Sequence, residues 1–144
     1  MASLVAEKTH IMKEANGFET EDPDRRKLKK MTCFLGNMIV PICTGTHWYL
    51  LAVGPEHAWV LCSMGGRYRV LERNIKRLLG KTCIYPKVPK QTNGRDCGVF
   101  TVMYAVGLLK ESNWSQIQWP TLVSSDIEDT GRQLIQHTLM KWCC

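Results

Sequence analysis

The middle of the chain carries short runs of nearly continuous hydrophobic residues, separated by turn-forming residues. Such runs are typical of β-strands that are covered on both faces of a sheet. The Gly-Pro-Glu-His segment at 54–57 and the paired glycines at 65 and 66 supply turns between neighbouring runs. We predict four strands, at residues 37–43, 47–53, 58–63 and 81–85.

In other segments the apolar residues recur at the spacing of a helix. A first helix is expected within residues 4–15, and a second at 70–79, where Gly80 ends it. A third spans 99–109 and is the most apolar helix-length segment of the chain. Strands and helices combined in this way predict one α+β domain.

The last helix is predicted to begin at Ser125, because Glu128 follows three residues later in a capping-box pattern. Its apolar residues line one face, which we interpret as core packing and not as a cofactor site. They are Ile127, Leu134, Ile135, Thr138, Leu139 and Trp142.

Composition narrows the class of protein. The 144 residues fit one domain, and 44% hydrophobic and 22% charged residues are ordinary for a globular protein. The seven cysteines are scattered without a Cys-x-x-Cys pair, so we expect free thiols, no metal site, no cofactor, and a nuclear or cytoplasmic location. Early charges and short apolar runs argue against a signal peptide or a membrane partner.

The net charge of +6 and the basic run at 25–30 raise the alternative of nucleic-acid binding. Acidic residues just before this run neutralise part of its charge. We therefore favour a solvated segment over a nucleic-acid contact, and strongly salt-dependent binding to DNA or RNA would contradict that choice.

Residues 89–100 place a cysteine between a polar turn and the apolar helix. Asn93 and Gly94 are turn formers and Asp96 suits the N-cap, so Cys97 is expected in the first turn. A thiol there lies near the positive end of the helix dipole and unpaired backbone N–H groups, which favour the nucleophilic thiolate. A small cysteine that only packs is the alternative, and this stretch alone does not decide between the two.

A nucleophilic cysteine requires a general base and donors for an oxyanion. Among the histidines, at positions 10, 47, 57 and 137, His47 is the best candidate for the base because it opens an apolar strand. Gln91, six residues before Cys97, could supply an oxyanion donor together with backbone N–H groups. Both assignments depend on Cys97 being catalytic.

The His47-Trp48 pair and the segment Pro89-Lys-Gln-Thr-Asn-Gly-Arg-Asp-Cys-Gly-Val-Phe100 resemble the ubiquitin-like-protein-specific cysteine protease family. That family comprises the SUMO-processing and sentrin-specific proteases and the adenovirus-type endopeptidases. The resemblance runs from about Ile39 to the last helix. It implies a papain-like cysteine protease fold, with a central helix packed on a small, mostly antiparallel sheet.

The resemblance also implies roles for individual residues. His47 matches the general base, Cys97 the nucleophile and Gln91 the oxyanion-hole glutamine. Trp48 matches the tryptophan that packs over the di-glycine tail of the modifier. The implied reaction is hydrolysis after Gly-Gly in SUMO-type precursors or conjugates, with a ubiquitin-like modifier as the partner.

Two departures from the family pattern point to impaired activity. Cys62 stands where the family has an aspartate that orients the imidazole, and a neutral thiol accepts hydrogen bonds poorly. Replacing the aspartate of a serine triad by asparagine lowers turnover by about 10⁴-fold. In addition, no tryptophan precedes His47, whereas the family has one that forms a wall of the glycine tunnel.

We therefore divide the chain into residues 1–30, a helix and charged loop that are a truncated part of the catalytic domain, and 31–144, the ubiquitin-like protease catalytic domain. The leading hypothesis is a cysteine peptidase that forms an acyl-enzyme on Cys97. The alternative is an impaired or inactive, transposon-derived homologue that acts at most as a ubiquitin-like-protein binding module.

Overall fold

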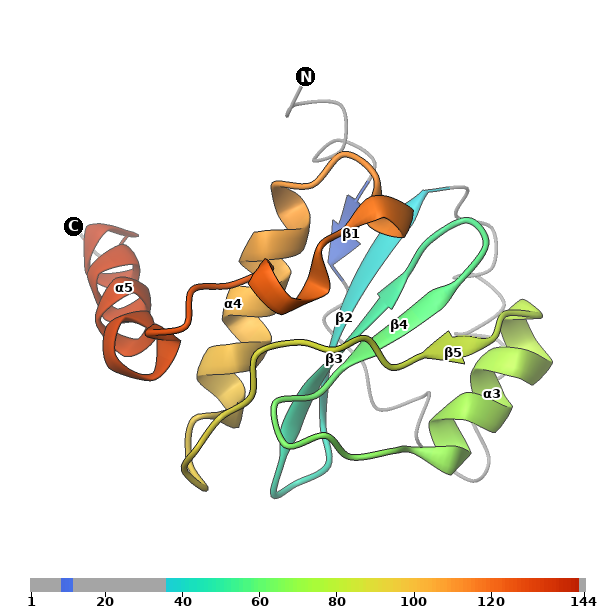
Figure 1. Ribbon diagram of the computed structural model, residues 1–144, viewed down its shortest axis with the longest axis horizontal. Helices are drawn as coiled ribbons and strands as arrows, with labels where there is room; N and C mark the ends of the chain where they lie inside the picture. The colour runs from blue at the N-terminus through green and yellow to red at the C-terminus, as the bar shows by residue number, and fades with distance from the viewer. Residues whose placement is uncertain (1–8, 12–35, 143–144) are drawn as a thin grey trace.

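The computed structural model describes residues 9–11 and 36–142, which include a five-stranded sheet flanked by helices (Figure 1). The strands lie in the sheet in the order of the sequence. The inner pairs β2–β3 and β3–β4 are antiparallel, whereas the outer pairs β1–β2 and β4–β5 are parallel, so the sheet is mixed. The strands are β1 (Thr9–Ile11), β2 (Asn37–Cys43), β3 (Trp48–Val53), β4 (Ala58–Leu61) and β5 (Cys83–Ile84).

Three α-helices are described with the sheet. The helices α3 (Arg69–Leu79) and α4 (Cys97–Leu109) cover its opposite faces, and α5 (Ile127–Trp142) lies beside α4 (Figure 1). Two short 3-10 helices, η2 (Trp114–Gln116) and η3 (Trp119–Thr121), lie between α4 and α5 in the chain. None of the helices in the described ranges is long and apolar enough to cross a membrane.

Both faces of the sheet are buried, because successive residues of a strand point to opposite sides. Leu51 belongs to one cluster with Leu71 and Ile75 of α3, and Leu50 to the other cluster with Phe100 of α4. Burying a side chain of this size stabilises the fold by roughly 1.5–3 kcal/mol relative to leaving it exposed. The prediction of strands covered on both faces is confirmed, and α4 is the predicted central helix.

The predicted ends of two helices are also confirmed. The helix α3 stops before Gly80, whose φ of 67° lies in the left-handed region that favours glycine. The helix α4 begins at Cys97, which therefore stands at the N-terminal end of a helix that packs on the sheet.

The prediction of a helix within residues 4–15 is wrong for residues 9–11, which are the part of this range that the structure describes. Residues Thr9–Ile11 form β1, which pairs in parallel with the first three residues of β2. The open edge of β2 offers backbone partners that a helix would leave unused, and this pairing overrides the local helical spacing. The remaining residues of 1–35, including the basic run at 25–30, lie outside the described residues.

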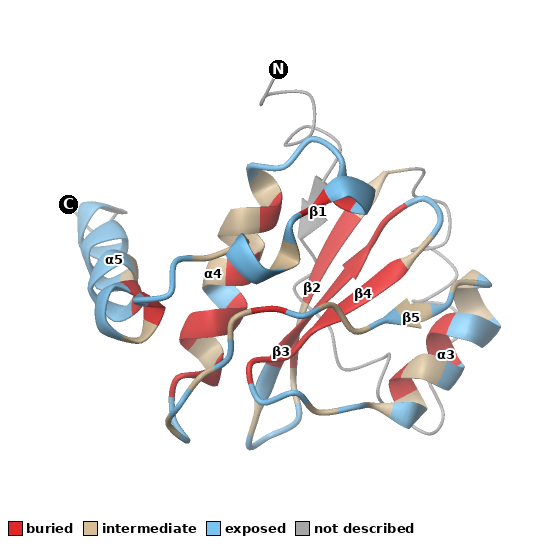
Figure 2. Ribbon diagram, in the orientation of Figure 1, coloured by how far each residue is buried: buried red, intermediate tan, exposed pale blue. Residues whose placement is uncertain are grey.

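The apolar stripe of α5 is a second prediction that the structure contradicts. Ile127 is buried, but Leu134 and Leu139 are 50% and 61% exposed. Figure 2 shows that the buried residues of α5 lie in its first turns and that its other end projects away from the sheet. The helices α4 and α5 approach closely at Gly131 of α5, where an added Cβ would lie 2.7 Å from Cγ1 of Val99 of α4. Because α4 covers only the first turns of α5, most of the stripe is not core packing.

Candidate active site

His47 and Cys62 meet where β3 begins and β4 ends. These strands are antiparallel and Leu50 pairs with Leu61, so the residue before β3 comes close to the residue after β4. His47 Nε2 is 3.2 Å from Cys62 Sγ. Cys62 is buried and His47 is half-buried. One ring nitrogen is therefore occupied by a sulfur, and a general base at this position would have to act through Nδ1.

Cys97 is brought to the same region through the residues that follow it and His47. Trp48 comes after His47, and Gly98 comes after Cys97. An added Cβ at Gly98 would lie 3.8 Å from Cδ1 of the Trp48 indole, so the first turn of α4 packs against the start of β3. Cys97 is buried, with 8% exposed, whereas Trp48 is 43% exposed. An accessible aromatic ring thus stands beside the first turn that carries the thiol.

Gln91 is held in one orientation by two neighbours. Its Oε1 accepts a hydrogen bond from the hydroxyl of Ser63, and its Nε2 donates to the backbone oxygen of Asn93 at 2.5 Å. The backbone N–H of Gln91 also donates to the backbone carbonyl oxygen of Ser63, at 3.1 Å. Ser63 is buried and directly follows Cys62. An amide carries two N–H donors, so one remains for an oxyanion while the first anchors the side chain.

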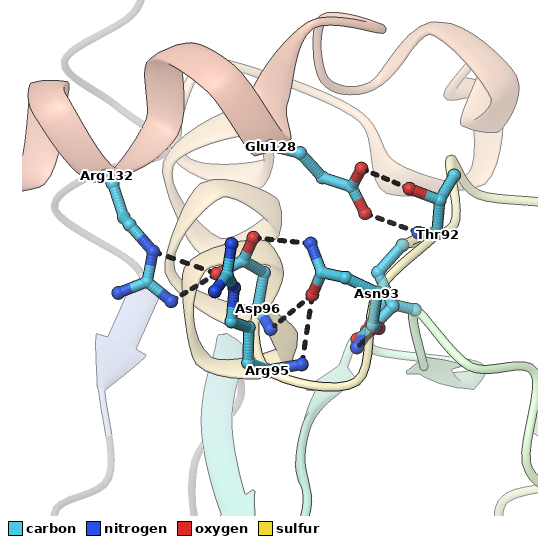
Figure 3. Close-up of polar contacts among 8 residues, drawn as sticks. Thr92, Asn93, Arg95, Asp96, Glu128 and Arg132 are labelled. Carbon is cyan, nitrogen blue, oxygen red and sulfur yellow. Dashed lines mark hydrogen bonds and ion pairs between the residues drawn. The ribbon is translucent and has the colours of Figure 1, made fainter.

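The loop before Cys97 is fixed by a chain of polar contacts that reaches α5 (Figure 3). Asn93 Oδ1 accepts from the backbone N–H groups of Arg95 and Asp96, at 2.9 and 3.0 Å, and its Nδ2 donates to Asp96 Oδ2 at 2.8 Å. The other oxygen of Asp96 accepts from Nε of Arg132 at 2.9 Å and from its terminal amino group. A residue of α5 thus holds the residue that precedes the candidate nucleophile.

Asp96 does not act as the predicted side-chain N-cap. It occupies the N-cap position of α4, but its carboxylate makes no capping hydrogen bond to the helix. The carboxylate instead binds Asn93 and Arg132. The hydrogen bond from Asn93 is the larger cause and that from Arg132 the next, and both hold the pKa of Asp96 below its usual range. In the contact with Arg132 both partners are charged, whereas a backbone N–H at the helix start carries no net charge.

Glu128 provides a second link between α5 and the loop. The backbone N–H and the hydroxyl of Thr92 both donate to its carboxylate, the hydroxyl at 2.6 Å. Both bonds lower the pKa of Glu128, and the bond from the Thr92 hydroxyl has the larger effect. The capping box predicted for Ser125 and Glu128 is therefore wrong. The helix begins at Ile127, and the Asp126 carbonyl accepts the first N–H groups of the turn.

The other histidines lie elsewhere. His57 is in a turn near the ring of Trp59, at 5.9 Å between ring centres, and His137 is exposed on α5. The side chain of His10 is outside what the structure describes. Within residues 9–11 and 36–142, no three side chains of the metal-binding types are grouped closely enough to hold a metal ion.

Four residues of this region were not predicted: Ser63, Tyr68, Glu128 and Arg132. Glu128 and Arg132 are four residues apart, so they lie on one face of the predicted helix, and this polar pair was the available signal. The hydroxyl of Tyr68 is 3.2 Å from Cys62 Sγ. For Ser63 and Tyr68 the only signal was that both lie within six residues of Cys62.

The sequence has recognisable relatives. Residues 5–137 match the sequence model of the Ulp1 protease family, C-terminal catalytic domain. This range includes both segments on which the resemblance was based, the His47-Trp48 pair and residues 89–100. No curated protein sequence matches the chain.

Solved structures share the fold. A de-sumoylating protease gives a TM-score of 0.66 at 15% identity, over 92% of this chain and 70% of its own. The effector XopD of Xanthomonas campestris, bound to ubiquitin, gives 0.58 at 17% identity, over 87% and 77%. The C-terminal Ulp1 protease domain in complex with Smt3, the yeast ortholog of SUMO, gives 0.54 at 18% identity, over 73% and 60%.

At these identities the likeness concerns the fold, and the predicted papain-like α+β architecture is confirmed. The chain covers only part of the length of some of these structures. It spans 60% of the yeast domain and 35% of the Ulp1-like SUMO protease catalytic domain of Chaetomium thermophilum.

Proposed function

Because the chain belongs to the Ulp1 family of cysteine proteases, we propose that it cleaves peptide or isopeptide bonds after the Gly-Gly end of a ubiquitin-like modifier. The observation that carries this proposal is the contact of His47 with Cys62 beside the first turn of α4, which begins at Cys97. Related domains in complex with Smt3 and with ubiquitin support a modifier of this class.

In the proposed reaction, Nδ1 of His47 takes the thiol proton of Cys97, and the sulfur attacks the carbonyl carbon of the last glycine. The Gln91 amide and backbone N–H groups at the start of α4 donate to the oxyanion. The amine leaves with the proton from His47, and an acyl-enzyme remains. Water then loses a proton to His47 and attacks the thioester, which releases the modifier carboxylate and restores the Cys97 thiol.

The surroundings of the thiol support a preference for glycine in the substrate. The Trp48 indole is exposed and lies against Gly98, so a substrate chain that passes between β3 and the first turn of α4 meets a flat ring. Residues without a side chain fit such a passage most easily. Gln91 is already oriented by Ser63, so the oxyanion donor needs little reorganisation when the carbonyl arrives.

We expect turnover to be slow, because Cys62 occupies the place of the orienting carboxylate. A thiol is a weak hydrogen-bond partner, and it brings no negative charge to the imidazolium that forms during catalysis. Loss of the corresponding charge in a serine triad costs about 10⁴-fold in turnover, while residual catalysis survives. A sulfur at position 62 therefore predicts a weakened enzyme.

Labelling by a modifier tests the proposal. The probes are a SUMO-type modifier and ubiquitin, each with an electrophile at its C-terminal glycine. We expect the wild-type chain to gain the mass of one modifier and Cys97→Ser to gain none. Cys43→Ser, which removes a half-buried thiol of β2, is the matched control and should be labelled like the wild type. Equal labelling of Cys97→Ser would contradict the proposal.

A binding module is the second candidate, and Cys62 is the observation that favours it. A chain of this kind would bind the intact modifier without cleaving it. Calorimetry with Cys97→Ser measures that binding separately from chemistry. If this variant binds the modifier, and neither the wild type nor Cys62→Asp forms an adduct, the binding module replaces the peptidase.

A further inference from the structure

We propose that Tyr68 is a positioning residue of this site, which lets the Cys62 sulfur accept a hydrogen bond from His47. The inference rests on the proposed function, because it concerns how His47 is prepared to act on Cys97. It assigns a role to a residue outside the motif segments. It also explains how a cysteine could serve where a carboxylate is absent.

Among the described residues, three groups make hydrogen-bond contacts with the Cys62 sulfur. His47 Nε2 and the Tyr68 hydroxyl oxygen each lie 3.2 Å from Sγ, and the backbone N–H of Gly66 donates to it at 3.4 Å. The sulfur is buried, with Cys62 only 4% exposed, so it has little access to water. The proton of the thiol must therefore be directed among these neighbours.

The charged state of the histidine decides where that proton goes. After Nδ1 has taken the proton of Cys97, the imidazolium carries N–H groups on both ring nitrogens, so Nε2 can only donate. The backbone N–H of Gly66 also only donates. The Cys62 sulfur must then accept from both, and its own S–H needs an acceptor. The Tyr68 oxygen is the neighbour that can accept it.

Without that acceptor, the S–H of Cys62 would point at Nε2 of the neutral imidazole. The ring proton would then reside on Nδ1, where it blocks transfer from Cys97. A phenol hydroxyl can also donate, so Tyr68 would still stabilise the sulfur if Cys62 lost its proton. In either case the hydroxyl of Tyr68 favours the tautomer that leaves Nδ1 able to accept a proton.

The Tyr68 hydroxyl is held in place by packing and by the backbone. Its ring stacks on Tyr49 of β3, with ring centres 3.9 Å apart and planes inclined by 14°. Its backbone N–H donates to the hydroxyl of Tyr85 at 3.0 Å. The contact with Cys62 is therefore built into the fold and requires little ordering when substrate binds.

The test removes the hydroxyl and keeps the ring, with Tyr68→Phe. We expect the rate of Cys97 labelling by the modifier probe, or kcat with a modifier fused to a reporter, to fall about three- to tenfold, as for loss of one neutral hydrogen bond. KM should not change. Thr138→Val is the control, because it removes an exposed hydroxyl of α5 that bonds to the Leu134 backbone oxygen and contacts neither Tyr68 nor Cys62, and it should retain the wild-type rate.

A Cys62→Asp background sharpens the test. A carboxylate accepts from Nε2 by itself and carries no proton to redirect, so the effect of Tyr68→Phe should shrink to less than about twofold. An equal loss in both backgrounds would assign Tyr68 a merely structural role and overturn the inference. An unchanged or faster rate of Tyr68→Phe in the wild-type background would overturn it as well.

A spectroscopic readout separates this inference from the proposed function. The ¹⁵N chemical shifts of His47 report which ring nitrogen carries the proton, with or without turnover. We expect the Nε2–H tautomer to dominate in the wild type and the Nδ1–H tautomer to increase in Tyr68→Phe. Identical tautomer populations would refute the role of Tyr68 even in an active enzyme. If no variant forms an adduct, the proposed function fails while the tautomer measurement still stands.

Discussion

The two sides of the candidate site are held by different kinds of contact. On the helix side, the loop before Cys97 is bound to α5 through Asn93, Asp96 and Arg132. Two of these three side chains, Asp96 and Arg132, are charged. On the sheet side, the imidazole of His47 meets a sulfur that is in turn held by a hydroxyl and a backbone N–H. A charged pair thus anchors the loop before Cys97, whereas the atom that contacts Nε2 of His47 is a sulfur.

This difference teaches that placement and electrostatics are separate properties of the site. Packing of the sheet against α4 brings the start of β3 to Gly98, whereas Cys62 belongs to the cluster on the opposite face of the sheet. A cysteine fills the buried position after β4 without disturbing that packing. Under the proposed function, the group at position 62 contributes to stabilising the imidazolium of His47, and a sulfur supplies less of this stabilisation than a carboxylate.

Restoring the charge on the sheet side should have the largest effect. In Cys62→Asp, a carboxylate would accept from Nε2 of His47 and stabilise the imidazolium. We expect turnover to rise on the order of 10²-fold, with about 10⁴-fold as the ceiling set by serine triads. Steady-state cleavage of a modifier fused to a reporter measures the gain.

Cys62→Asn is the matched control for this change. It places a group of the same shape, without charge, beside the imidazole, and should bring much less improvement. An equal gain in both variants would show that shape, and not charge, limits the wild type. No gain in either would mean that another partner already orients His47.

Removing the charge from the helix side should have the next largest effect. Arg132→Ala leaves the Asp96 carboxylate, which is 4% exposed, with Asn93 as its remaining side-chain partner. Since the guanidinium itself is 56% exposed, we expect a loss of about 1–2 kcal/mol in the free energy of unfolding, measured with urea. Labelling of Cys97 should slow because the loop is less fixed.

The exposed residue Gln136, one helical turn further along α5, offers the control. Gln136→Ala should change the free energy of unfolding by less than about 0.5 kcal/mol. If Arg132→Ala is no less stable than this control, the contact between Asp96 and Arg132 contributes nothing measurable to the free energy of unfolding.

Acid should weaken the helix side in a way that depends on Asp96. Hydrogen bonds from Asn93 and then Arg132 hold the pKa of this carboxyl below its usual range. A depressed pKa stabilises the fold above the pKa of the unfolded state, about 4, and the contribution is lost as the pH falls through the lower folded-state pKa. The gap in urea midpoint between the wild type and Arg132→Ala should therefore be largest near pH 7.

Below about pH 4 this gap should narrow, and urea titrations at pH 7 and pH 3 measure it. Glu128 also has a lowered pKa, but it is present in both chains and cancels in the comparison. A gap that is the same at both pH values would show that the stabilisation by Arg132 does not come from the charge on Asp96.

Much of the framework could be predicted from local patterns. The strands β2 to β5, the helix that ends before Gly80 and the helix that begins at Cys97 each follow from a run of apolar residues with a turn former beside it. The family followed from the spacing of His47-Trp48 and the segment at 89–100, and the match to residues 5–137 confirms it. The choice of Cys62 as the residue in place of the aspartate also came from sequence position.

Local patterns failed where a distant partner competed with a near one. Glu128 looked like a capping residue because a helix start lay three positions before it, yet its carboxylate binds Thr92, 36 residues away. Asp96 was expected to cap its own helix and instead binds Arg132, again 36 residues away. Each carboxylate can accept only a few hydrogen bonds, and only the folded chain shows which donors reach it.

The sequence by itself determined the order of the main strands and helices from β2 onward, the helix start at Cys97 and the absence of a carboxylate at position 62, because these depend on neighbouring residues. Only the tertiary structure decided that α5 would hold the loop before Cys97, that most of its apolar stripe would stay exposed, and that Tyr68 would reach the Cys62 sulfur. Periodicity gives the face of a helix, but the element that covers that face is set by packing between segments far apart in the chain.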